Sequence, residues 1–391
     1  IIIYHHEINK PFPKANVIIN PKKDNGYLEY DYLCATSLSY FFLEILIKKI
    51  KSKIDLRKYL IYVLLATVCD VMPLRKLNRL IAITALNEFK IDKNLIFKEL
   101  YKLNNKKNKL NINDLGFLIG PILNAGGRLG KSQYAVELLS TENRTIINKK
   151  SLELINLNNK RKKMETMIMK SIDFDKLEKE NKDIIIYYNS NIHEGLIGII
   201  ASRLKDYFNK PSIVITNSNN ILKGSARSIY TYNIGKAIKL SLDKNILLKG
   251  GGHSMAAGFS LKKKNLQQFK DLMNDLFFKN NSFINNSFYY DFEVSTSAFN
   301  KEFYSDLKKL EPFGVGNPLP TFLFKDLKII KSSILKDKHI SCILKTKIGF
   351  SINSIAFDSC NKIIGKYLLN YKKKFSVIGQ INENFWNNKK T

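Results

Sequence analysis

The alternation of apolar and polar residues in the first third of the chain is typical of strands followed by helices. Residues 1–5, which begin with three isoleucines, are predicted to form a buried strand, and residues 32–51 are apolar over several helical turns. A second apolar helix is predicted over 60–71, with Met72-Pro73 as its stop signal. Further helical patterns follow at 77–89, 115–123 and 132–139. This order predicts an α/β domain, which we place at residues 1–141.

The next part of the chain is charged and then returns to an α/β pattern. Residues 142–180 keep only a partial apolar stripe, as a connecting helix that packs on one side would. We place a second α/β unit at residues 181–282. Its predicted elements are a strand over 184–188, a helix over 196–208, a strand over 212–216, a short strand after Gly250–Gly252 and a helix over 265–278.

Residues 283–391 show a different pattern, in which short β-type runs alternate. They follow an Asn-rich linker over 279–287 and include one helical stretch near 299–310. The runs lie at 321–330, 340–345, 352–357 and 375–380. This spacing predicts a small antiparallel β-barrel or sandwich, and a basic surface would suit such a barrel to nucleic acid.

The charge of the chain narrows its expected partners. The 391 residues include 64 Lys and Arg against 34 Asp and Glu, a formal net charge of +30. Such a surplus favours a polyanion such as nucleic acid, although a general bias toward Lys, Asn and Ile explains the charge equally well. Arginine is more informative because only eight occur. An arginine kept in a Lys-rich chain indicates a need for a planar, bidentate donor.

Length, hydropathy and cysteine usage set further limits. An apolar content of 45% supports two or three domains with ordinary buried cores. The apolar runs are shorter than the roughly 20 residues of a membrane span, so we expect a soluble protein without a membrane partner. Four cysteines without CxxC spacing suit reduced thiols in a cytoplasm and argue against a zinc knuckle. The first residue is Ile1, and we expect the sequence to begin inside a longer protein.

Two positions carry candidate metal chemistry. His5 and His6 follow the first strand, where α/β sheets place their ligands. Adjacent strand residues point to opposite faces, so only one can aim at a given metal unless the strand has already ended. A polar pair that caps a strand is the alternative. Asp70, at the end of an apolar helix, needs a partner, which a metal or a helix-end hydrogen bond would provide.

Eight stretches occur in a fixed order along the chain. They are IIIYHHEI, FPKANVIINP, LLATVCDVMPL with Asn78-Arg79, GPILNAGGRLG, HEGLIGIIASRL, GSARS, GGGHSMAAGFS and LEPFGVGNPLPTF. In this order they resemble the RecJ family of single-strand-specific 5′-to-3′ DNA exonucleases, which are DHH phosphoesterases. The resemblance spans nearly the whole chain. It implies that residues 1–141 are the C-terminal part of a DHH catalytic domain, that 181–282 are a DHH-associated substrate-binding domain, and that 283–391 are an OB-like nucleic-acid-binding domain.

The resemblance implies a metal site with two divalent cations, Mn²⁺ or Mg²⁺. His5 matches a metal-binding histidine of the family, His6 its neighbour near the scissile phosphate, and Asp70 a later metal-ligand aspartate. Hard carboxylates and imidazole suit cations that activate water and neutralise developing charge.

The resemblance also implies a phosphate site. Arg128, Ser225 and Arg227 match positions that hold the 5′ end or backbone of the strand, although helix-end or surface ion pairs are the alternative for each arginine. Gly251, Gly252 and His253 would offer unobstructed backbone amides and one imidazole to an anion, where a tight loop is the alternative. The family implies that His253 contacts the substrate phosphate and is catalytic along with His5, His6 and Asp70.

Two departures from the family pattern lower the expected activity. The aspartate-rich strand ends that precede His5 in the family are absent, which leaves His5 and Asp70 as metal ligands. We therefore expect this fragment to be inactive on its own. Tyr4 stands where the family has an aspartate that orients the metal cluster, and a neutral phenol predicts weakened metal affinity.

The function implied is metal-dependent hydrolysis of single-stranded DNA in repair and recombination in the cytoplasm. A helicase and a single-strand-binding protein are further partners that this function suggests. Two alternatives stay open. A DHH-family oligoribonuclease or cyclic-dinucleotide phosphodiesterase would lack the barrel over 288–391, and a catalytically dead single-strand-binding protein is favoured by Tyr4.

Overall fold

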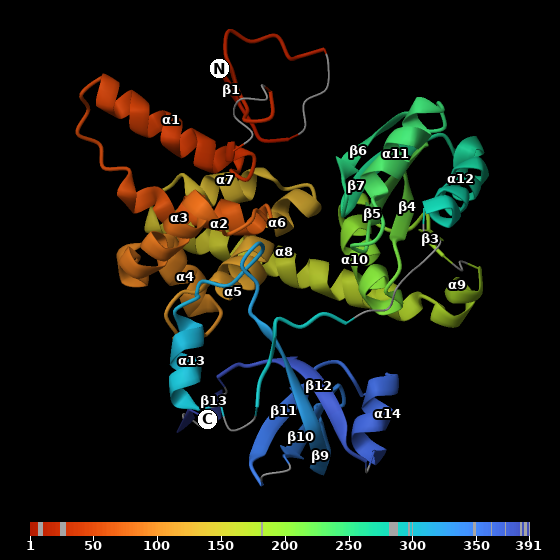
Figure 1. The fold of residues 1–391 in the computed structure, drawn as a ribbon. Helices are drawn as coiled ribbons and strands as arrows, with labels where there is room; N and C mark the ends of the chain where they lie inside the picture. The colour runs from red at the N-terminus through yellow and green to blue at the C-terminus, as the bar shows by residue number, and fades with distance from the viewer. Residues whose placement is uncertain are drawn as a thin grey trace. The chain divides into compact units, whose positions relative to one another are not determined.

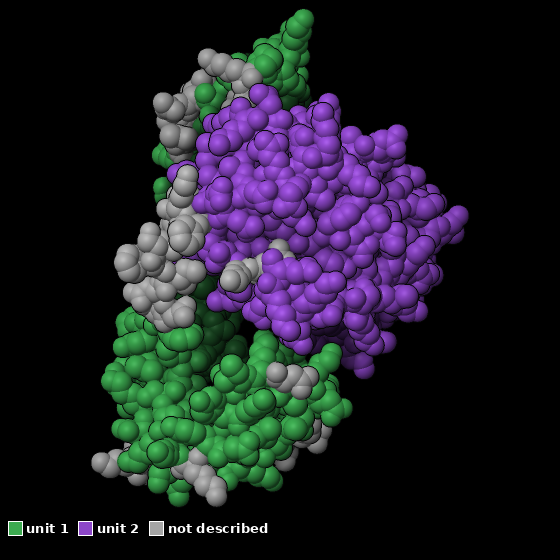
Figure 2. Space-filling view, turned by 90° about the vertical axis from the view of Figure 1, so that its right-hand side faces the viewer, with its two compact units in different colours: residues 1–89, 287–391 green, residues 90–286 purple. Residues whose placement is uncertain are grey.

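The protein is described here by a computed structural model that divides into two compact units (Figure 2). Unit 1 comprises Ile1–Phe89 and Ser287–Thr391, and unit 2 comprises Lys90–Asn286. The described residues are 1–6, 11–23, 29–180, 183–280, 288–295, 298, 300–346, 349–360, 362–371, 373–383, 385–386 and 389–390.

The N-terminal part of unit 1 is a small parallel sheet beside three helices (Figure 1). Its core includes Tyr32, Leu33 and Leu38, which pack against Ile3 of the sheet and Leu77. The apolar run predicted as one helix forms α2, most of which is buried. The elements are β1 (Ile2–Ile3), β2 (Ile18–Ile19), α1 (Ala35–Lys49), a 3-10 turn (Arg57–Tyr59), α2 (Leu60–Cys69) and α3 (Lys76–Glu88).

The C-terminal part of unit 1 is mostly antiparallel sheet, as its alternating pattern predicts. The strands pair in the order β11-β10-β9-β12, with β8 parallel to β9, and the described strands do not close into a barrel. Alternate residues of β10 face the core, namely Ile340, Cys342 and Leu344. The elements are β8 (Phe292–Glu293), α13 (Lys301–Lys308), β9 (Thr321–Leu335), β10 (His339–Lys345), β11 (Ser351–Ala356), α14 (Ile363–Asn370), β12 (Phe375–Gln380), β13 (Phe385–Trp386) and β14 (Lys389–Lys390).

Unit 2 begins with helices gathered along the long helix α8. Asn143 caps α8, because its side-chain oxygen accepts hydrogen bonds from the amides of Thr145 and Ile146. α4, α6 and α7 all pack on α8. The elements are a 3-10 turn (Ile91–Lys93), α4 (Leu95–Leu103), α5 (Ile112–Asp114), a π-helical turn (Leu115–Ile119), α6 (Gly120–Arg128), α7 (Gln133–Leu139), α8 (Arg144–Ser171) and α9 (Phe174–Glu180).

The second half of unit 2 is a five-stranded sheet in the order β3-β4-β5-β7-β6, in which only β3 and β4 pair in parallel. α10 packs on β4 and β5, while α11 packs on β6 and β7 and against α12. The elements are β3 (Ile185–Tyr188), a 3-10 turn (Glu194–Leu196), α10 (Ile197–Phe208), β4 (Ser212–Ser218), β5 (Ile221–Arg227), α11 (Ile234–Asp243), β6 (Lys249–His253), β7 (Ala256–Leu261), a 3-10 turn (Lys263–Asn265) and α12 (Leu266–Asn280).

Several expectations can be compared with these elements. The α/β fold class is confirmed. The glycine cluster, expected ahead of a strand, is itself strand β6. Residues 281–287 of the predicted linker lie outside the described residues. All four cysteines are free thiols. Across the described part of the chain, no helix has both the length and the apolar character needed to cross a membrane.

Candidate functional site

Asp70 is positioned by the end of helix α2. Its amide donates to the carbonyl of Ala66, and the amides of Val71 and Met72 turn back to the carbonyls of Val68 and Thr67. Val71 has a φ of +58°, a left-handed conformation in which glycine is usual at this position. The helix therefore ends at Cys69, two residues before the predicted end at residue 71, and Asp70 follows directly as its C-cap.

The structure brings His5 and Asp70 together within unit 1. His5 Nε2 lies 4.0 Å from Asp70 Oδ2, and the His5 side chain is 15% exposed. The first amide of α1, at Ala35, donates to His5 Nδ1 over 3.1 Å. A neutral ring that accepts at Nδ1 carries its proton on Nε2, so a cation could bind at Nε2 only if that proton moved to Nδ1 and the hydrogen bond from Ala35 were given up.

His6 and Tyr4 are the neighbours of His5 in the chain. Tyr4 is partly buried, and His6 is exposed. The ring centroid of His6 lies 4.4 Å from that of His5. The Asn20 side chain donates to the His6 carbonyl and fixes the backbone there. The amide of Tyr4 donates to the carbonyl of Ile19, which continues the pairing of β1 with β2. No carboxylate stands at residue 4, and hydrogen bonds to backbone groups hold the chain on both sides of His5.

An imidazole and a carboxylate that face each other are donors of the type that Mn²⁺ and Mg²⁺ accept. His5 and Asp70 therefore fit as part of a divalent-cation site. Within the residues that the structure describes, however, no group of three or more His, Cys, Asp or Glu side chains is arranged to hold a metal ion. The pair accounts for part of a ligand set.

Unit 2 brings four of the predicted phosphate-binding residues, namely Ser225, Arg227, Gly251 and His253, onto one face of its sheet. Arg227 of β5 pairs with Ala256 of β7, which in turn pairs with His253 of β6. Residues directly opposite each other in antiparallel strands point to the same face. A second row on that face runs from Ser225 through Gly258 to Gly251. Strands β5, β7 and β6 lie side by side in Figure 1.

The glycines of these strands differ in what surrounds them. A Cβ on Gly251 would meet nothing within 4 Å, and one on Gly258 would meet only the Gly224 carbonyl at 4.0 Å. The sheet face is therefore open at these two positions. Gly252 points the other way, where a Cβ would collide with Ala256 and Ala257. Close packing explains a glycine at Gly252, whereas Gly251, two strands from Ser225 in the same row, leaves the sheet face open.

Two glycines let Arg128 and Arg227 approach the start of helix α10 closely. Gly195 lies just before the helix, and Gly198 lies in its first turn. A Cβ on Gly195 would collide with the backbone carbonyl of Arg128, whose Nη1 donates to the Gly195 carbonyl over 3.3 Å. A Cβ on Gly198 would lie 3.0 Å from Arg227 Nη2 and 3.1 Å from Ser225 Oγ. The N-terminal turn of α10 thus lies against Arg128, Ser225 and Arg227.

The electrostatics of this cluster favour an anion. Burial lowers the pKa of Arg128, and nearby Arg161 lowers it further, while Glu165 opposes the shift. Burial also lowers the pKa of Arg227, and the charge of Arg128 adds to this. Among the described residues, neither Arg128 nor Arg227 forms an ion pair with a carboxylate. Half-buried cations that repel each other gain stability from an anion placed between them.

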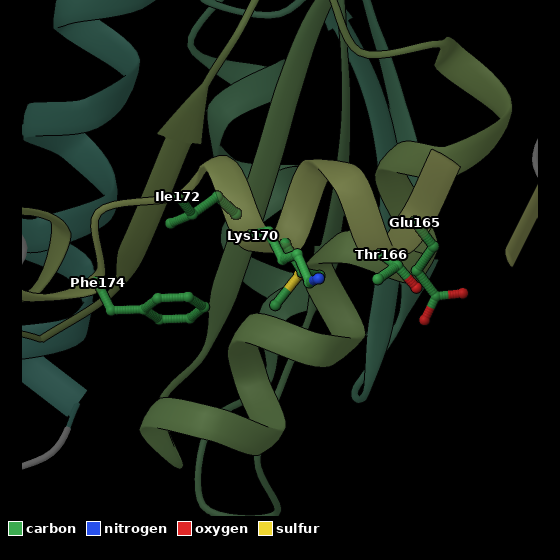
Figure 3. A pocket seen from close by; sticks show the side chains of 6 residues that line it. Glu165, Thr166, Lys170, Ile172 and Phe174 are labelled. Carbon is green, nitrogen blue, oxygen red and sulfur yellow. The ribbon is translucent and has the colours of Figure 1, made fainter. Parts of the chain in front are cut away.

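A buried ion network lies next to this cluster, and nothing in the sequence indicates it beyond the rarity of arginine. Arg161 Nη1 donates to Glu165 Oε2 over 2.9 Å, and Arg203 Nε donates to Glu165 Oε1 over 2.7 Å. Arg161 Nε also donates to Asn158. The network joins α8 to α10. Glu165 lies at one end and Phe174 at the other end of an open pocket of about 470 Å³ (Figure 3), which is lined by Glu165, Thr166, Met169, Lys170, Ile172 and Phe174.

Family models identify two parts of the chain. The DHHA1 domain matches residues 181–279, and the RecJ OB domain matches residues 290–391. These matches cover the sheet that carries Ser225, Arg227 and His253, and the antiparallel sheet of unit 1. The class of protein is therefore a DHHA1-containing α/β protein with an OB domain at its C-terminal end.

Curated relatives narrow the family. The chain is 28% identical over 403 residues to the single-stranded-DNA-specific exonuclease RecJ of Bacillus subtilis, with 100% of this chain and 49% of that protein covered. It is 29% identical over 380 residues to the RecJ of Haemophilus influenzae, with 92% of this chain and 66% of that protein covered. The chain is thus similar to RecJ exonucleases over 92–100% of its length. It spans half to two thirds of the length of these relatives.

Solved structures show the same fold. A crystal structure of RecJ from Thermus thermophilus in complex with Mn²⁺ matches with a TM-score of 0.82 at 22% identity, covering 99% of this chain and 55% of that chain. A second structure of RecJ from that organism, in complex with Mg²⁺, matches with a TM-score of 0.75 at 23% identity, covering 92% of this chain and 54% of that chain. The fold match thus extends over both units of this chain.

Proposed function

We propose that this chain forms part of a metal-dependent 5′-to-3′ exonuclease that hydrolyses phosphodiester bonds of single-stranded DNA. The observation that carries the proposal is the cluster of Arg128, Ser225 and Arg227 at the N-terminal turn of α10, with two half-buried guanidiniums not paired with carboxylates among the described residues. Guanidinium forks, a hydroxyl and a helix N-terminus are donors suited to a terminal phosphate. The open floor at Gly251 leaves room for the strand, and His253 would contact the next phosphate.

His5 and Asp70 would hold one of two divalent cations, Mn²⁺ or Mg²⁺. When bound, these cations supply an activated water and neutralise charge on the phosphate. His6, exposed beside His5, would lie near the scissile phosphate. Because two ligands are too few for two cations, we propose that the isolated 391-residue chain is inactive, and that Tyr4 weakens metal affinity further by offering no negative charge.

The role of this activity would be DNA repair and recombination in the cytoplasm, with a helicase and a single-strand-binding protein as partners that supply and cover the strand. The names of the curated relatives support the exonuclease activity on which this role depends. The match to the RecJ OB domain favours it over an oligoribonuclease or a cyclic-dinucleotide phosphodiesterase. Tyr4 supports one other candidate function, that of a single-strand-binding protein without catalysis.

A binding experiment on the 391-residue chain tests the phosphate site. Fluorescence anisotropy would compare single strands that carry a 5′-phosphate with the same strands ending in a 5′-hydroxyl. The phosphorylated strand should bind about tenfold more tightly, since one set of charge-assisted hydrogen bonds contributes 1.5–3 kcal/mol. Arg128→Lys and Arg227→Lys should remove most of this preference. Equal affinity for both strands in the parent chain would contradict the proposal.

A cleavage experiment on the natural protein separates the candidate functions. Manganese-dependent shortening of single-stranded DNA from its 5′ end, without attack on duplex or RNA, is the expected result. Preference for short RNA would favour the oligoribonuclease, and tight binding without cleavage would favour the catalytically dead protein. Tyr4→Asp should raise activity at low manganese, because the added carboxylate orients the metal ligands.

A further inference from the structure

The loop that follows Asp70 is held from two sides within unit 1. On one side, the end of α2 fixes residues 70–72 through the backbone hydrogen bonds already described. On the other side, the amide of Leu74 donates to the carbonyl of Val315 over 2.6 Å. Leu74 is 2% exposed. If Val315 moved away, water could not easily replace the hydrogen bond that the Leu74 amide would lose. A segment more than 200 residues away in the chain thus closes the Asp70 loop.

That segment, the 310–317 turn, lies between α13 and β9 and has a rigid internal structure. The Asn317 side chain donates to the carbonyls of Leu310 and Pro312 over 2.9 and 3.0 Å. Gly314 and Asn317 also exchange both backbone hydrogen bonds. The turn therefore keeps its shape through contacts of its own, independently of the loop that it touches.

The turn meets the Asp70 loop and α3 at close range. Gly316 has a φ of +75°, and a Cβ there would lie 2.7 Å from the Cβ of Pro73. Arg79 of α3 donates through Nη2 to the carbonyls of Leu310 and Glu311 over 2.8 and 3.2 Å. Asn78, fully buried, donates to the Pro73 carbonyl over 3.1 Å. Pro73 is thus confined between α3 and Gly316.

We propose that the 310–317 turn is a positioning element for Asp70, so that the region matched by the RecJ OB domain helps to build the metal site as well as to bind the strand. The inference rests on the proposed function, in which Asp70 is a metal ligand. Its physical basis is that the Asp70 carboxylate can keep its orientation toward His5 only while residues 71–74 stay in place. Groups that orient a ligand from behind typically change metal affinity by 10–100-fold when they are lost.

Two glycines of unit 1 provide a matched pair of variants. Gly316 and Gly349 both have positive φ, +75° and +94°, so alanine strains the backbone at either position. Only Gly316 faces Pro73, whereas a Cβ on Gly349 would meet nothing within 4 Å. Gly316→Ala therefore disturbs the Asp70 loop, and Gly349→Ala reports the effect of strain alone.

The experiment measures manganese affinity of the natural protein by electron paramagnetic resonance, together with amide hydrogen exchange at residues 71–74 without metal. Gly316→Ala should weaken manganese binding about 10-fold and accelerate exchange at these amides, while Gly349→Ala leaves both unchanged. Asp70→Asn serves as the reference for loss of the ligand. If Asp70→Asn binds manganese weakly but Gly316→Ala binds it as tightly as the parent, this inference is overturned and the metal assignment stands, whether or not exchange is faster. Parent-like affinity in Asp70→Asn would overturn the metal assignment and this inference with it.

Discussion

Val71 is held in a backbone conformation that its side chain disfavours. Its φ of +58° belongs to the left-handed region, and its side chain is 63% exposed and so gains little from packing. The conformation persists because Asp70 before it and Met72 after it are both hydrogen-bonded to α2. Strain of this kind, next to a candidate ligand, is typical of functional sites.

Val71→Gly should therefore stabilise the protein. Relief of the left-handed penalty of 1–2 kcal/mol exceeds the entropic cost of glycine, for a net gain of about 0.5–1 kcal/mol in the free energy of unfolding. Urea denaturation would measure this gain. Val71→Ala keeps a Cβ and should give little of it, so equal stability of the two variants would contradict the explanation by backbone strain.

Tyr232 carries a buried hydroxyl that has no hydrogen-bond partner in the described part of the chain. The residue is 3% exposed and packs against Phe277. Burial raises the pKa of Tyr232 from 10.0 to about 12. Its neutral form therefore adds stability that is fully present below pH 10 and is lost as the pH rises through about 12.

Tyr232→Phe should raise the free energy of unfolding by about 1 kcal/mol at pH 8, because an unpaired buried hydroxyl is removed. Above pH 10 the advantage of the variant should grow, at most by about 1.4 kcal/mol per pH unit, since phenylalanine does not ionise in the unfolded chain. Urea denaturation at pH 8 and 11 would measure both effects. Tyr101→Phe is the contrasting control, because it loses a hydrogen bond to Asp114 and should be destabilised. A loss of stability at pH 8 in Tyr232→Phe would refute the assignment.

At the scale of elements, the Glu165 network holds α8 against α10. Arg161 is 9% exposed and depends on Glu165 and Asn158 for its hydrogen bonds. Glu165→Gln leaves this guanidinium buried without a counter-charge. Breaking one side of a buried pair costs about 3–5 kcal/mol, and we expect a loss near the lower end because Arg203 is largely exposed.

Thermal or urea unfolding would measure the effect of Glu165→Gln. Glu180→Gln is the matched control, since Glu180 pairs with Lys176 on the exposed surface of α9 at 3.9 Å. Surface pairs of this kind contribute at most about 1 kcal/mol. If both variants lost the same small amount, the network would not hold the two helices together.

The elements show which parts of the fold the sequence could predict. Long periodic runs gave α1, α2 and α10 to within a few residues, because an amphipathic or apolar stretch has few alternatives. Strand β6 was missed as a strand because Gly250–Gly252 disfavour strands on their own. The register with β7 and close packing at Gly252 overrode that preference. Strand β5, helix α4, helix α11 and helix α14 were not predicted either.

At the scale of the whole molecule, the predicted site residues lie in two units. His5 and Asp70 meet in unit 1, and Arg128, Ser225 and Arg227 meet in unit 2. The contacts that bring them together depend on long-range packing, such as Gly195 against Arg128 and Arg79 against the 310–317 turn. Periodicity says nothing of such contacts, because they join segments whose separation in the chain is arbitrary.

The net charge of +30 makes nonspecific attraction a competing explanation for any binding of single strands. The salt dependence of the affinity distinguishes nonspecific attraction from a specific phosphate contact. Each phosphate contact on a single strand contributes about 0.7 to the slope of log affinity against log salt concentration. If Arg227 binds a phosphate, Arg227→Gln should lower the slope by about 0.7. Arg144→Gln removes the same charge from an exposed position at the start of α8 and should leave the slope unchanged. Equal slopes in the two variants would mean that overall charge alone attracts the strand.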